Sequence, residues 1–313
     1  MHISRSPGRA LGRNARAQGM PERSTEPQIP YRGVWDRLFV RDPETDEELD
    51  LGPAWSTAWT QKLTLAANQA DTAVFEFPAD SGALITSIRA VGTSSAFTFA
   101  FTDVTDGVAR PYQDRPIRGA IIFQTTAPPL RLWTPEGIGP GPVMLPPNAR
   151  LECTLSDLSG ASNTVFVTVE GLRLQRNRSI LERLSALASE TLFIHSTPES
   201  FTIPASGAYF DPFPKIGIAG GASFVMHQIA CTQQTGWSLN MDTANNSEPW
   251  FNGDIPIENL IGASSVTPGG LTMPRGAAAG DTIRIKAASR TGGAIVVAQL
   301  ALIGTKDWRG GRT

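Results

Sequence analysis

Short runs of apolar and β-branched residues, separated by turn residues, dominate the chain from about residue 51 onward. In many runs apolar and polar positions alternate, which is the pattern of a strand with one buried face. Asp106-Gly107 and Ser159-Gly160 are turn signals between such runs. The pattern predicts strands at 74–77, 96–102, 119–124, 151–155, 164–172, 191–195, 200–203, 223–231, 237–241, 282–287 and 294–303.

Two segments interrupt this pattern. Residues 125–147 contain seven prolines, which predicts a loop. Ser179-Ile180-Leu181-Glu182 has the form of a capping box, and Ile180, Leu184 and Leu187 fall on one helical face. We therefore expect a short helix near 180–189.

The second half of the chain repeats landmarks of the first half in the same order. At an offset of 140 residues, Asp114-Arg-Pro-Ile is echoed by Asp254-Ile-Pro-Ile. Beyond the proline-rich loop the offset falls to about 132. The other matched landmarks are Phe75–Ala79 with Phe201–Ala205, Phe97-Thr-Phe99-Ala-Phe101 with Trp237-Ser-Leu239-Asn-Met241, Pro128 with Pro268, Asn148–Cys153 with Asp281–Ile285, and Glu170-Gly171 with Ile303-Gly304.

This repeat predicts the domain organisation. We expect two copies of a β-domain with seven or eight strands each, at 51–175 and 191–313, joined by the linker helix at 176–190. That many strands in that length is typical of a sandwich or jelly roll. The predicted fold class is thus all-β: two tandem antiparallel β-sandwich domains, jelly-roll-like, preceded by an extended arm at 1–50.

Composition agrees with β-structure and excludes several classes of protein. The 313 residues include 30 Gly and 24 Pro, only 18% are charged, and the net charge is −2, so the chain as a whole is not a basic nucleic-acid binder. The longest apolar run, 294–304, is too short to span a bilayer as a helix. Cys153 and Cys231 lie inside apolar runs, which predicts buried free thiols and no disulfide framework.

The N-terminal arm is the most strongly charged segment. Before residue 42 eight arginines are opposed by three acidic residues, a net charge of +5, and an acidic run follows at 42–50. Such a segment cannot bury enough apolar surface to fold alone, so it is either a disordered tail or an arm that orders on an acidic partner. Carboxylates of neighbouring subunits are favoured over packaged nucleic acid, because the planar guanidinium group binds carboxylates at fixed positions. The candidate partner-binding residues are Arg5, Arg9, Arg13, Arg16 and Arg23.

The search for catalytic or cofactor chemistry yields no candidate that stands out. The three histidines, His2, His195 and His227, lack metal-ligand spacing, and no nucleophile or phosphate-binding motif occurs. Asp114 and Asp254 are the repeated acids, and each is expected to cap its own turn. Asp103 and Asp106 could join Asp114 around a calcium ion, but the spacing is not that of an EF-hand. We therefore expect no catalytic residue, no cofactor and no metal.

The seven tryptophans leave one binding function open. Trp55, Trp59, Trp133 and Trp250 lie near predicted loops, where aromatic rings could stack on a sugar, but subunit interfaces use tryptophan as readily. Trp237 occupies a predicted strand and is expected in the core. Aromatic content alone does not decide between these alternatives.

The repeated D-x-P-I, proline loop and closing strand ending near Gly resemble the jelly-roll and β-sandwich modules of bacteriophage virion proteins, over residues 51–175 and 190–305. The resemblance implies a non-catalytic structural protein of the virion that assembles in the host cytoplasm. It would contact other capsid or neck subunits, would form a homo-oligomer and would not bind a membrane. Two roles stay open: an accessory decoration, spike or neck protein, or a double jelly-roll major capsid protein. The alternative from another class is a receptor- or carbohydrate-binding module of a tail or surface protein.

Overall fold

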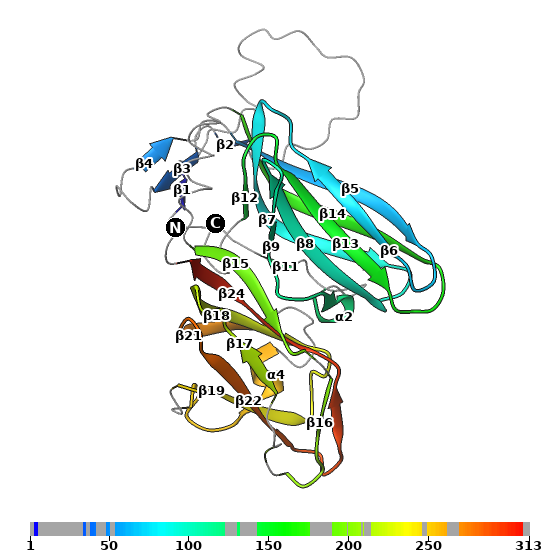
Figure 1. The fold of residues 1–313 in the computed structure, drawn as a ribbon, viewed down its shortest axis with the longest axis vertical. Coiled ribbons are helices and arrows are strands. Elements are labelled where there is room, and N and C mark those ends of the chain that lie inside the picture. The colour runs from blue at the N-terminus through cyan, green and yellow to red at the C-terminus, as the bar shows by residue number, and fades with distance from the viewer. Residues whose placement is uncertain are drawn as a thin grey trace.

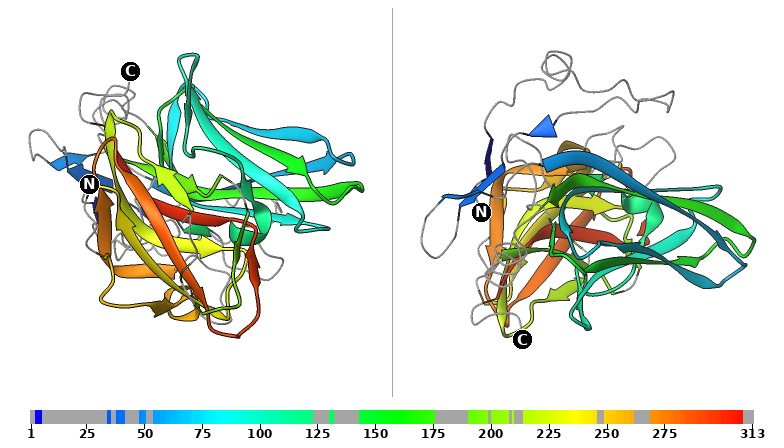
Figure 2. Two further views of the ribbon diagram at one scale, coloured as in Figure 1. Left: turned by 60° about the horizontal axis from the view of Figure 1, so that its bottom comes forward. Right: turned by 90° about the horizontal axis from the view of Figure 1, so that it is seen from above.

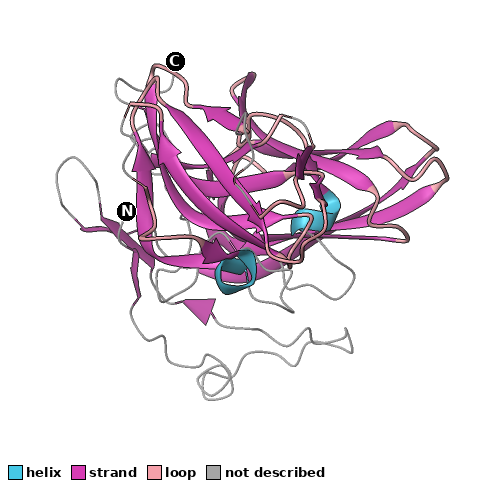
Figure 3. Ribbon diagram, turned by 90° about the horizontal axis from the view of Figure 1, so that it is seen from below, coloured by secondary structure: helices cyan, strands magenta, loops and turns pink. Residues whose placement is uncertain are grey.

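The protein consists of two β-sandwiches packed against each other (Figure 1). Further views show the same arrangement from other directions (Figure 2). The computed structural model describes residues 3–5, 34–35, 38–41, 48–50, 54–122, 130–131, 143–175, 190–198, 200–207, 209, 214–245, 249–261 and 269–308. Strands make up most of this part of the chain, and the two helices α2 and α4 are short (Figure 3). The prediction of an all-β fold is confirmed.

The first sandwich contains two antiparallel sheets. One has the order β11-β7-β14-β5-β2, with β12 also paired to β7, and the other has the order β10-β8-β13-β6, with β9 paired to β8. The strands are β2 (Val34–Trp35), β5 (Ala54–Leu65), β6 (Ala70–Glu76), β7 (Ser81–Gly92), β8 (Phe97–Thr105), β9 (Val108–Pro111), β10 (Ile117–Arg118), β11 (Leu130–Arg131), β12 (Val143–Leu145), β13 (Arg150–Asp157) and β14 (Asn163–Gln175).

The second sandwich has sheets of the order β15-β24-β18-β21 and β17-β22-β19-β20, with a separate pair β16-β23. Its strands are β15 (Glu190–Ser196), β16 (Phe201–Ile203), β17 (Lys215–Gly217), β18 (Ala222–Cys231), β19 (Trp237–Thr243), β20 (Ile255–Pro256), β21 (Gly269–Ala277), β22 (Thr282–Ser289), β23 (Ile295–Val297) and β24 (Leu300–Trp308).

Both sandwiches have the connectivity of a jelly roll. Their eight principal strands, counted along the chain, are β5, β6, β7, β8, β10, β12, β13 and β14 in the first and β15, β17, β18, β19, β20, β21, β22 and β24 in the second. In each case the first, eighth, third and sixth strands form one sheet, and the second, seventh, fourth and fifth form the other. This order is produced by two nested Greek keys, so the two halves share one topology.

A bulge at the same place in both halves shows how closely they correspond. The register between β14 and β7 shifts at Glu170/Gly171, and the register between β24 and β18 shifts at Ile303/Gly304. A Cβ atom on Gly171 would lie 2.2 Å from the carbonyl oxygen of Leu84, and one on Gly304 would lie 2.0 Å from that of Val225. Each glycine therefore allows a close backbone approach that no side chain permits.

One landmark of the sequence repeat is wrong. Phe75 of β6 pairs with Leu151, and Ile216 of β17 pairs with Ile283, so Ile216 is the structural counterpart of Phe75. Phe201 lies instead in β16, which pairs with β23. The similarity between 75–79 and 201–205 is thus local and does not reflect equivalent strands.

Two strand predictions are also corrected. Residues 119–122 form the helix α2 (Gly119–Ile122), because Ile117 and Ile121, four residues apart, are both buried on one side of this turn. Its counterpart α4 (Ile257–Ile261) buries Ile257 and Ile261 in the same way. The predicted run 294–303 is divided into β23 and β24, because Thr232 Oγ1 accepts hydrogen bonds from the backbone N–H groups of residues 298 and 299.

The predicted arm contributes four short strands. β1 (Ile3–Arg5) pairs with β3 (Leu38–Arg41), which pairs with β4 (Glu48–Asp50), and β2 extends the β5 edge of the first sandwich. Part of the segment is therefore paired rather than simply extended, since its short apolar runs have strand propensity. The predicted linker helix at 180–189 lies outside the described residues.

The interiors of both sandwiches are filled by large apolar side chains. Phe97, Phe99 and Phe101 of β8 are buried in the first, and Trp237, Leu239 and Met241 of β19 are buried in the second. These matched triplets lie on the fourth strand of each jelly roll, as the sequence repeat predicts. Cys153 and Cys231 are buried free thiols, also as predicted; burial raises the pKa of both and that of Cys231 to about 12.

Asp157 connects two turns at one end of the first sandwich. Its carboxylate accepts hydrogen bonds from the Ser159 hydroxyl and from the backbone N–H groups of Asn68, Ser159 and Gly160. These donors, above all the Ser159 hydroxyl, lower the pKa of Asp157 to about 2. The charged form of Asp157 therefore helps to hold the β5–β6 turn against the β13–β14 turn.

Replacing either bulge glycine tests the correspondence between the halves. Gly171→Ala and Gly304→Ala are each expected to lower the free energy of unfolding by about 1–3 kcal/mol, because the backbone must move to accommodate Cβ. Gly217→Ala is the control: it lies in a strand, and an added Cβ meets no atom within 4 Å. Thermal and urea unfolding measure the effect. Equal stability of all three variants would contradict the proposed steric requirement.

Asp157 makes the stability of the first sandwich dependent on pH. Its pKa is lowered in the folded state, so its contribution is present above about pH 4 and is lost as the pH falls toward 2. The difference in unfolding midpoint between wild type and Asp157→Ala should therefore shrink over this range. Asp80→Ala, at an exposed carboxylate, is the control. A difference that does not change with pH would count against the role of the charge.

Candidate functional site at the junction of the two sandwiches

The two sandwiches meet where a segment of the first lies along an edge strand of the second. Tyr112, Gln113 and Asp114 follow β9 and run parallel to β15. The N–H of Ile194 donates to the carbonyl oxygen of Tyr112 at 2.8 Å, and the N–H of Asp114 donates to that of Ile194 at 3.1 Å. The first sandwich thereby adds a short parallel strand to the β15-β24-β18-β21 sheet and covers its open edge.

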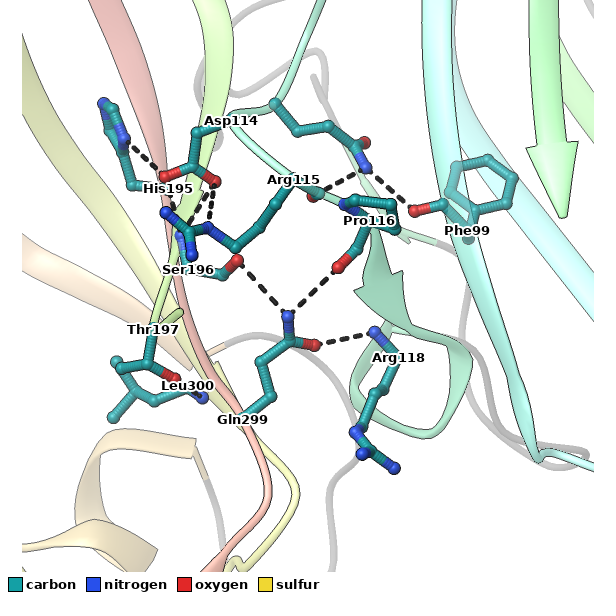
Figure 4. Close-up of polar contacts among 11 residues, drawn as sticks. Phe99, Asp114, Arg115, Pro116, Arg118, His195, Ser196, Thr197, Gln299 and Leu300 are labelled. Atoms are coloured by element: carbon teal, nitrogen blue, oxygen red, sulfur yellow. Dashed lines mark hydrogen bonds and ion pairs between the residues drawn. The ribbon is translucent and has the colours of Figure 1, made fainter. Parts of the chain in front are cut away.

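The Asp114 carboxylate strengthens this contact (Figure 4). Its Oδ2 lies 3.1 Å from Nδ1 of His195, and its Oδ1 accepts from the N–H of Ser196 at 3.2 Å. Because an ionised carboxylate only accepts, Nδ1 carries the proton in this contact. The prediction that Asp114 caps its own turn is therefore wrong, since the carboxylate binds groups of the other sandwich.

Gln299 holds the junction from the opposite side. Its Oε1 accepts from the N–H of Arg118 at 2.7 Å, and its Nε2 donates to the carbonyl oxygen of Pro116 at 3.1 Å and to Oγ of Ser196 at 3.3 Å (Figure 4). The side chain is 7% exposed. One amide thus satisfies polar groups of both sandwiches in a buried place, where leaving them unpaired would be costly.

The segment itself is held firmly by the first sandwich. Oε1 of Gln113 accepts from the N–H of Phe101, and Nε2 donates to the carbonyl oxygens of Phe99 and Arg115. Oδ2 of Asp103 accepts from the Tyr112 hydroxyl at 2.6 Å. The segment that pairs with β15 is therefore held in place by contacts within the first sandwich.

Apolar packing covers most of the junction. The outward-facing side chains of the β15-β24-β18 face join the same buried cluster as the core of the first sandwich. None of them is more than 3% exposed. This set, called the junction face below, comprises Leu192, Ile194, Ala230, Ala301 and Ile303. Contact through a continuous core makes the two sandwiches one packing unit.

The sequence carried a signal for this junction that the pattern analysis missed. The run Leu300-Ala301-Leu302-Ile303 is apolar at four successive positions, whereas a strand with one solvated face alternates. Leu300 and Leu302 face the core of the second sandwich, and Ala301 and Ile303 face the first. The absence of alternation therefore marks β24 as a strand that is buried on both faces.

The second sandwich also contains a buried charged cluster that sequence reasoning did not find. The fully buried Asp242 carboxylate lies 2.6 Å from Nε of Arg284 and 2.7 Å from Nζ of Lys286. Burial alone would raise the pKa of Asp242, but the hydrogen bonds and charges of Arg284 and Lys286 outweigh it and lower the pKa. Asp242 therefore stays ionised and ties β19 to β22.

The residues proposed from the sequence as a calcium site do not come together. Asp103 is buried beside Tyr112 and Arg110, Asp106 lies in the turn before β9, and Asp114 lies at the junction. In the described part of the chain, no group of three or more His, Cys, Asp or Glu residues is arranged to hold a metal ion. No helix among those residues is long and apolar enough to cross a membrane.

Of the five candidate arm residues, one lies within the described part of the chain. Arg5 ends β1, while Arg9, Arg13, Arg16 and Arg23 lie outside the described residues. Their binding role stays a prediction.

The tryptophans whose side chains are described pack against the two cores. Trp237 is fully buried, as predicted, and Trp59 and Trp250 are partly buried against the two cores. Trp133 lies outside the described residues, and Trp55 is placed only as part of β5. Trp59, Trp237 and Trp250 therefore form no shared binding surface.

Comparisons with known proteins do not assign the chain to a family. No family model matches the chain, and no curated protein matches it. Among solved structures, a chain of a quasi-atomic model of the PBCV-1 virus capsid is 8% identical, covers 82% of this chain and 97% of its own length, and has a TM-score of 0.31. Similarity at this level carries no weight, so the jelly-roll assignment rests on the strand order.

Gln299 is the sharpest test of the junction. Gln299→Leu keeps the size of the side chain but removes three hydrogen bonds, of which those to Arg118 and Pro116 bridge the sandwiches and that to Ser196 lies within the second, so we expect a loss of about 2–4 kcal/mol in unfolding free energy. Gln69→Leu, at an exposed position, is the control. Urea unfolding provides the measurement. If both variants unfold at the same midpoint as wild type, the junction does not contribute to stability as described.

Proposed function

We propose that this chain is a structural protein of a virus particle and forms its shell as a double jelly-roll subunit. The observation that carries the proposal is the fusion of two complete jelly rolls into one unit through the junction face. Jelly rolls serve as capsid, lectin and cupin domains, so topology alone does not select among these uses. The way the two are joined is what favours a capsid role.

The sandwich interiors support a building block rather than a binding module. Cupin-type sites lie inside the barrel, but here aromatic and aliphatic side chains fill both interiors. The polar residues that converge at the junction bind one another, although Nε2 of His195 and Nε of Arg115 are buried without a hydrogen-bond partner among the described residues. Densely packed interiors and a bound junction support a rigid unit, which a shell subunit requires.

The junction also favours a shell-forming role over an accessory one within the particle. A subunit that tiles a surface benefits from two similar blocks held at a fixed relative position, because each block can contact its neighbours through similar surfaces. Two jelly rolls of equal topology joined by a buried face meet this need. This is an analogy at the level of the fold.

The finer assignment follows the resemblance of the sequence. We infer that the particle is a bacteriophage, that the chain assembles with other copies of itself and with neighbouring virion proteins, and that the arm binds their carboxylates. Arg5, Arg9, Arg13, Arg16 and Arg23 would make these contacts. Packaged nucleic acid is the less favoured partner of the arm.

Copy number in purified particles tests the proposal. Quantitative mass spectrometry against the other virion proteins should place this chain among the most abundant components. A low copy number would identify an accessory protein and overturn the shell-forming role. Absence from particles, together with secretion or binding to a host surface, would overturn the structural role and favour the receptor- or carbohydrate-binding alternative.

Two sets of arm variants separate the partners of the arginines. Replacing all five with Gln should leave the thermal transition unchanged but reduce incorporation into particles, because the charge is lost. Replacing them with Lys keeps the charge and removes the planar fork, so incorporation should also fall if carboxylates are the partners. Normal incorporation of the Lys variant, with salt-sensitive binding to nucleic acid, would instead identify phosphates.

A further inference from the structure

The first sandwich has an edge that corresponds to the one covered at the junction. Gly304 pairs with Phe193 on β15, and Gly171 pairs with Thr57 on β5. Because these glycines are equivalent, Ala58 occupies the place of Ile194, Trp59 that of His195, and Thr60 that of Ser196. The backbone groups of Ala58 therefore face away from β14, as those of Ile194 face away from β24.

Among the described residues, little covers this β5 edge. β2 pairs only with Ala54 and Trp55, and within the described residues no other strand adds to this side of β5. Ala58 and Thr60 are exposed. An open strand edge offers unpaired N–H and C=O groups to another chain.

The second sandwich has a segment at the corresponding place in its chain, although this segment turns at Gly253, whose φ is +106° and whose N–H donates to the carbonyl oxygen of Phe251. Asn252–Asp254 precedes β20 as Tyr112–Asp114 precedes β10, and Asn252, Gly253 and Asp254 are all exposed. The N–H of Trp250 donates to Met241 as that of Tyr112 donates to Phe101, so this segment is two residues longer than its counterpart. The Asp254 carboxylate accepts from the Tyr209 hydroxyl at the surface and can still accept further donors.

We propose that copies of this chain associate head to tail, with Asn252–Asp254 of one copy lying along Ala58–Thr60 of the next. The proposal rests on the self-assembly assumed in the proposed function. The N–H of Ala58 donates to the carbonyl oxygen of Asn252, and the N–H of Asp254 donates to that of Ala58, which repeats the pattern at Ile194. The indole N–H of Trp59 and the backbone N–H of Thr60 then donate to the Asp254 carboxylate. They take the places of His195 and Ser196, which bind Asp114 within the chain.

The surface beside the β5 edge is more polar than the junction face beside β15. This difference makes the proposed contact between copies more polar than the junction within the chain. The positions of the first sandwich that match the junction face are polar or small, and they are not covered within the chain. In the order Leu192, Ile194, Ala230, Ala301 and Ile303, their counterparts are Ser56, Ala58, Arg89, Thr168 and Glu170. The contact between copies is therefore polar and reversible, while the contact within the chain is permanent.

One apolar side chain on this surface provides an anchor. Phe166 occupies the place of Gln299 on the equivalent strand and is 46% exposed. In the proposed contact it meets Pro256, the counterpart of Pro116. Exposed aromatic residues of this kind contribute strongly to protein interfaces.

Sedimentation velocity of the purified full chain tests the proposal. Wild type should associate reversibly, with larger species favoured as the protein concentration rises. Ala58→Pro removes the edge N–H and should weaken association at least ten-fold, while edge strands tolerate proline. Ala58→Thr keeps the N–H and is the control. Phe166→Ser, at an exposed position, should also weaken association.

The outcomes separate this inference from the proposed function. Unchanged association of Ala58→Pro, or a wild type that stays monomeric at all concentrations and salts, would overturn the head-to-tail contact even if the chain is abundant in particles. Association through this edge by a chain that is absent from particles would retain the contact and overturn the virion role. If residues 1–33 of the same chain already cover this edge, Ala58→Pro will leave the association unchanged. That result would also overturn the proposed contact.

Discussion

The burial of β24 on both faces is the constraint on which the architecture depends. Leu300 and Leu302 fill the second sandwich while Ala301 and Ile303 fill the junction, so this strand is stable only when both sandwiches are present. Apolar burial contributes roughly 25 cal/mol for each Å² removed from water. Exposing such a face would cost the chain a substantial part of the small net stability of a folded protein. The second sandwich therefore depends on the first for the cover of its outer sheet.

The two halves have the same residue where the backbone geometry requires it, and different residues where their surroundings differ. Gly171 and Gly304 are retained because a Cβ atom would collide with a carbonyl oxygen of the neighbouring strand. On the outer faces of these sheets no such restriction applies to the side chains, and Ile303 stands where the first half has the exposed Glu170. The two halves thus agree where steric requirements fix the residue, while side-chain polarity follows whether the position is covered.

Alternation and local turns predicted many of the strands and most of the repeat, but they missed β5, β7 and β21. Phe97–Phe101 and Trp237–Met241 were matched correctly because both lie on the fourth strand and place large apolar side chains at every second position, although burial alternates only in the first segment. The match of Phe75 with Phe201 failed because a short motif followed by proline can recur by chance in a chain rich in both. Residues 119–122 looked like a strand because β-branched residues occur in pairs there, and only the buried Ile117 and Ile121 show that the chain turns.

The junction could not be predicted in the same way, because it depends on partners far apart in sequence. Asp114 lies 81 residues from His195, and Gln299 lies 183 residues from Pro116. Nothing near Asp114 shows that its carboxylate leaves its own turn, so the local interpretation was favoured. Only the unbroken apolar run of β24 carried information about a covered outer face, and it does not say what covers it.

The contrast between the two outer faces follows from when each is covered. The junction face is buried as soon as one chain folds, so apolar residues there are never exposed for long. The matching positions on β5, β14 and β7 are mostly exposed in the single chain. Apolar residues at all of these positions would form an exposed patch that promotes aggregation of free chains. Polar residues with one exposed aromatic side chain, Phe166, avoid such a patch and are the composition expected for the reversible contact that we propose.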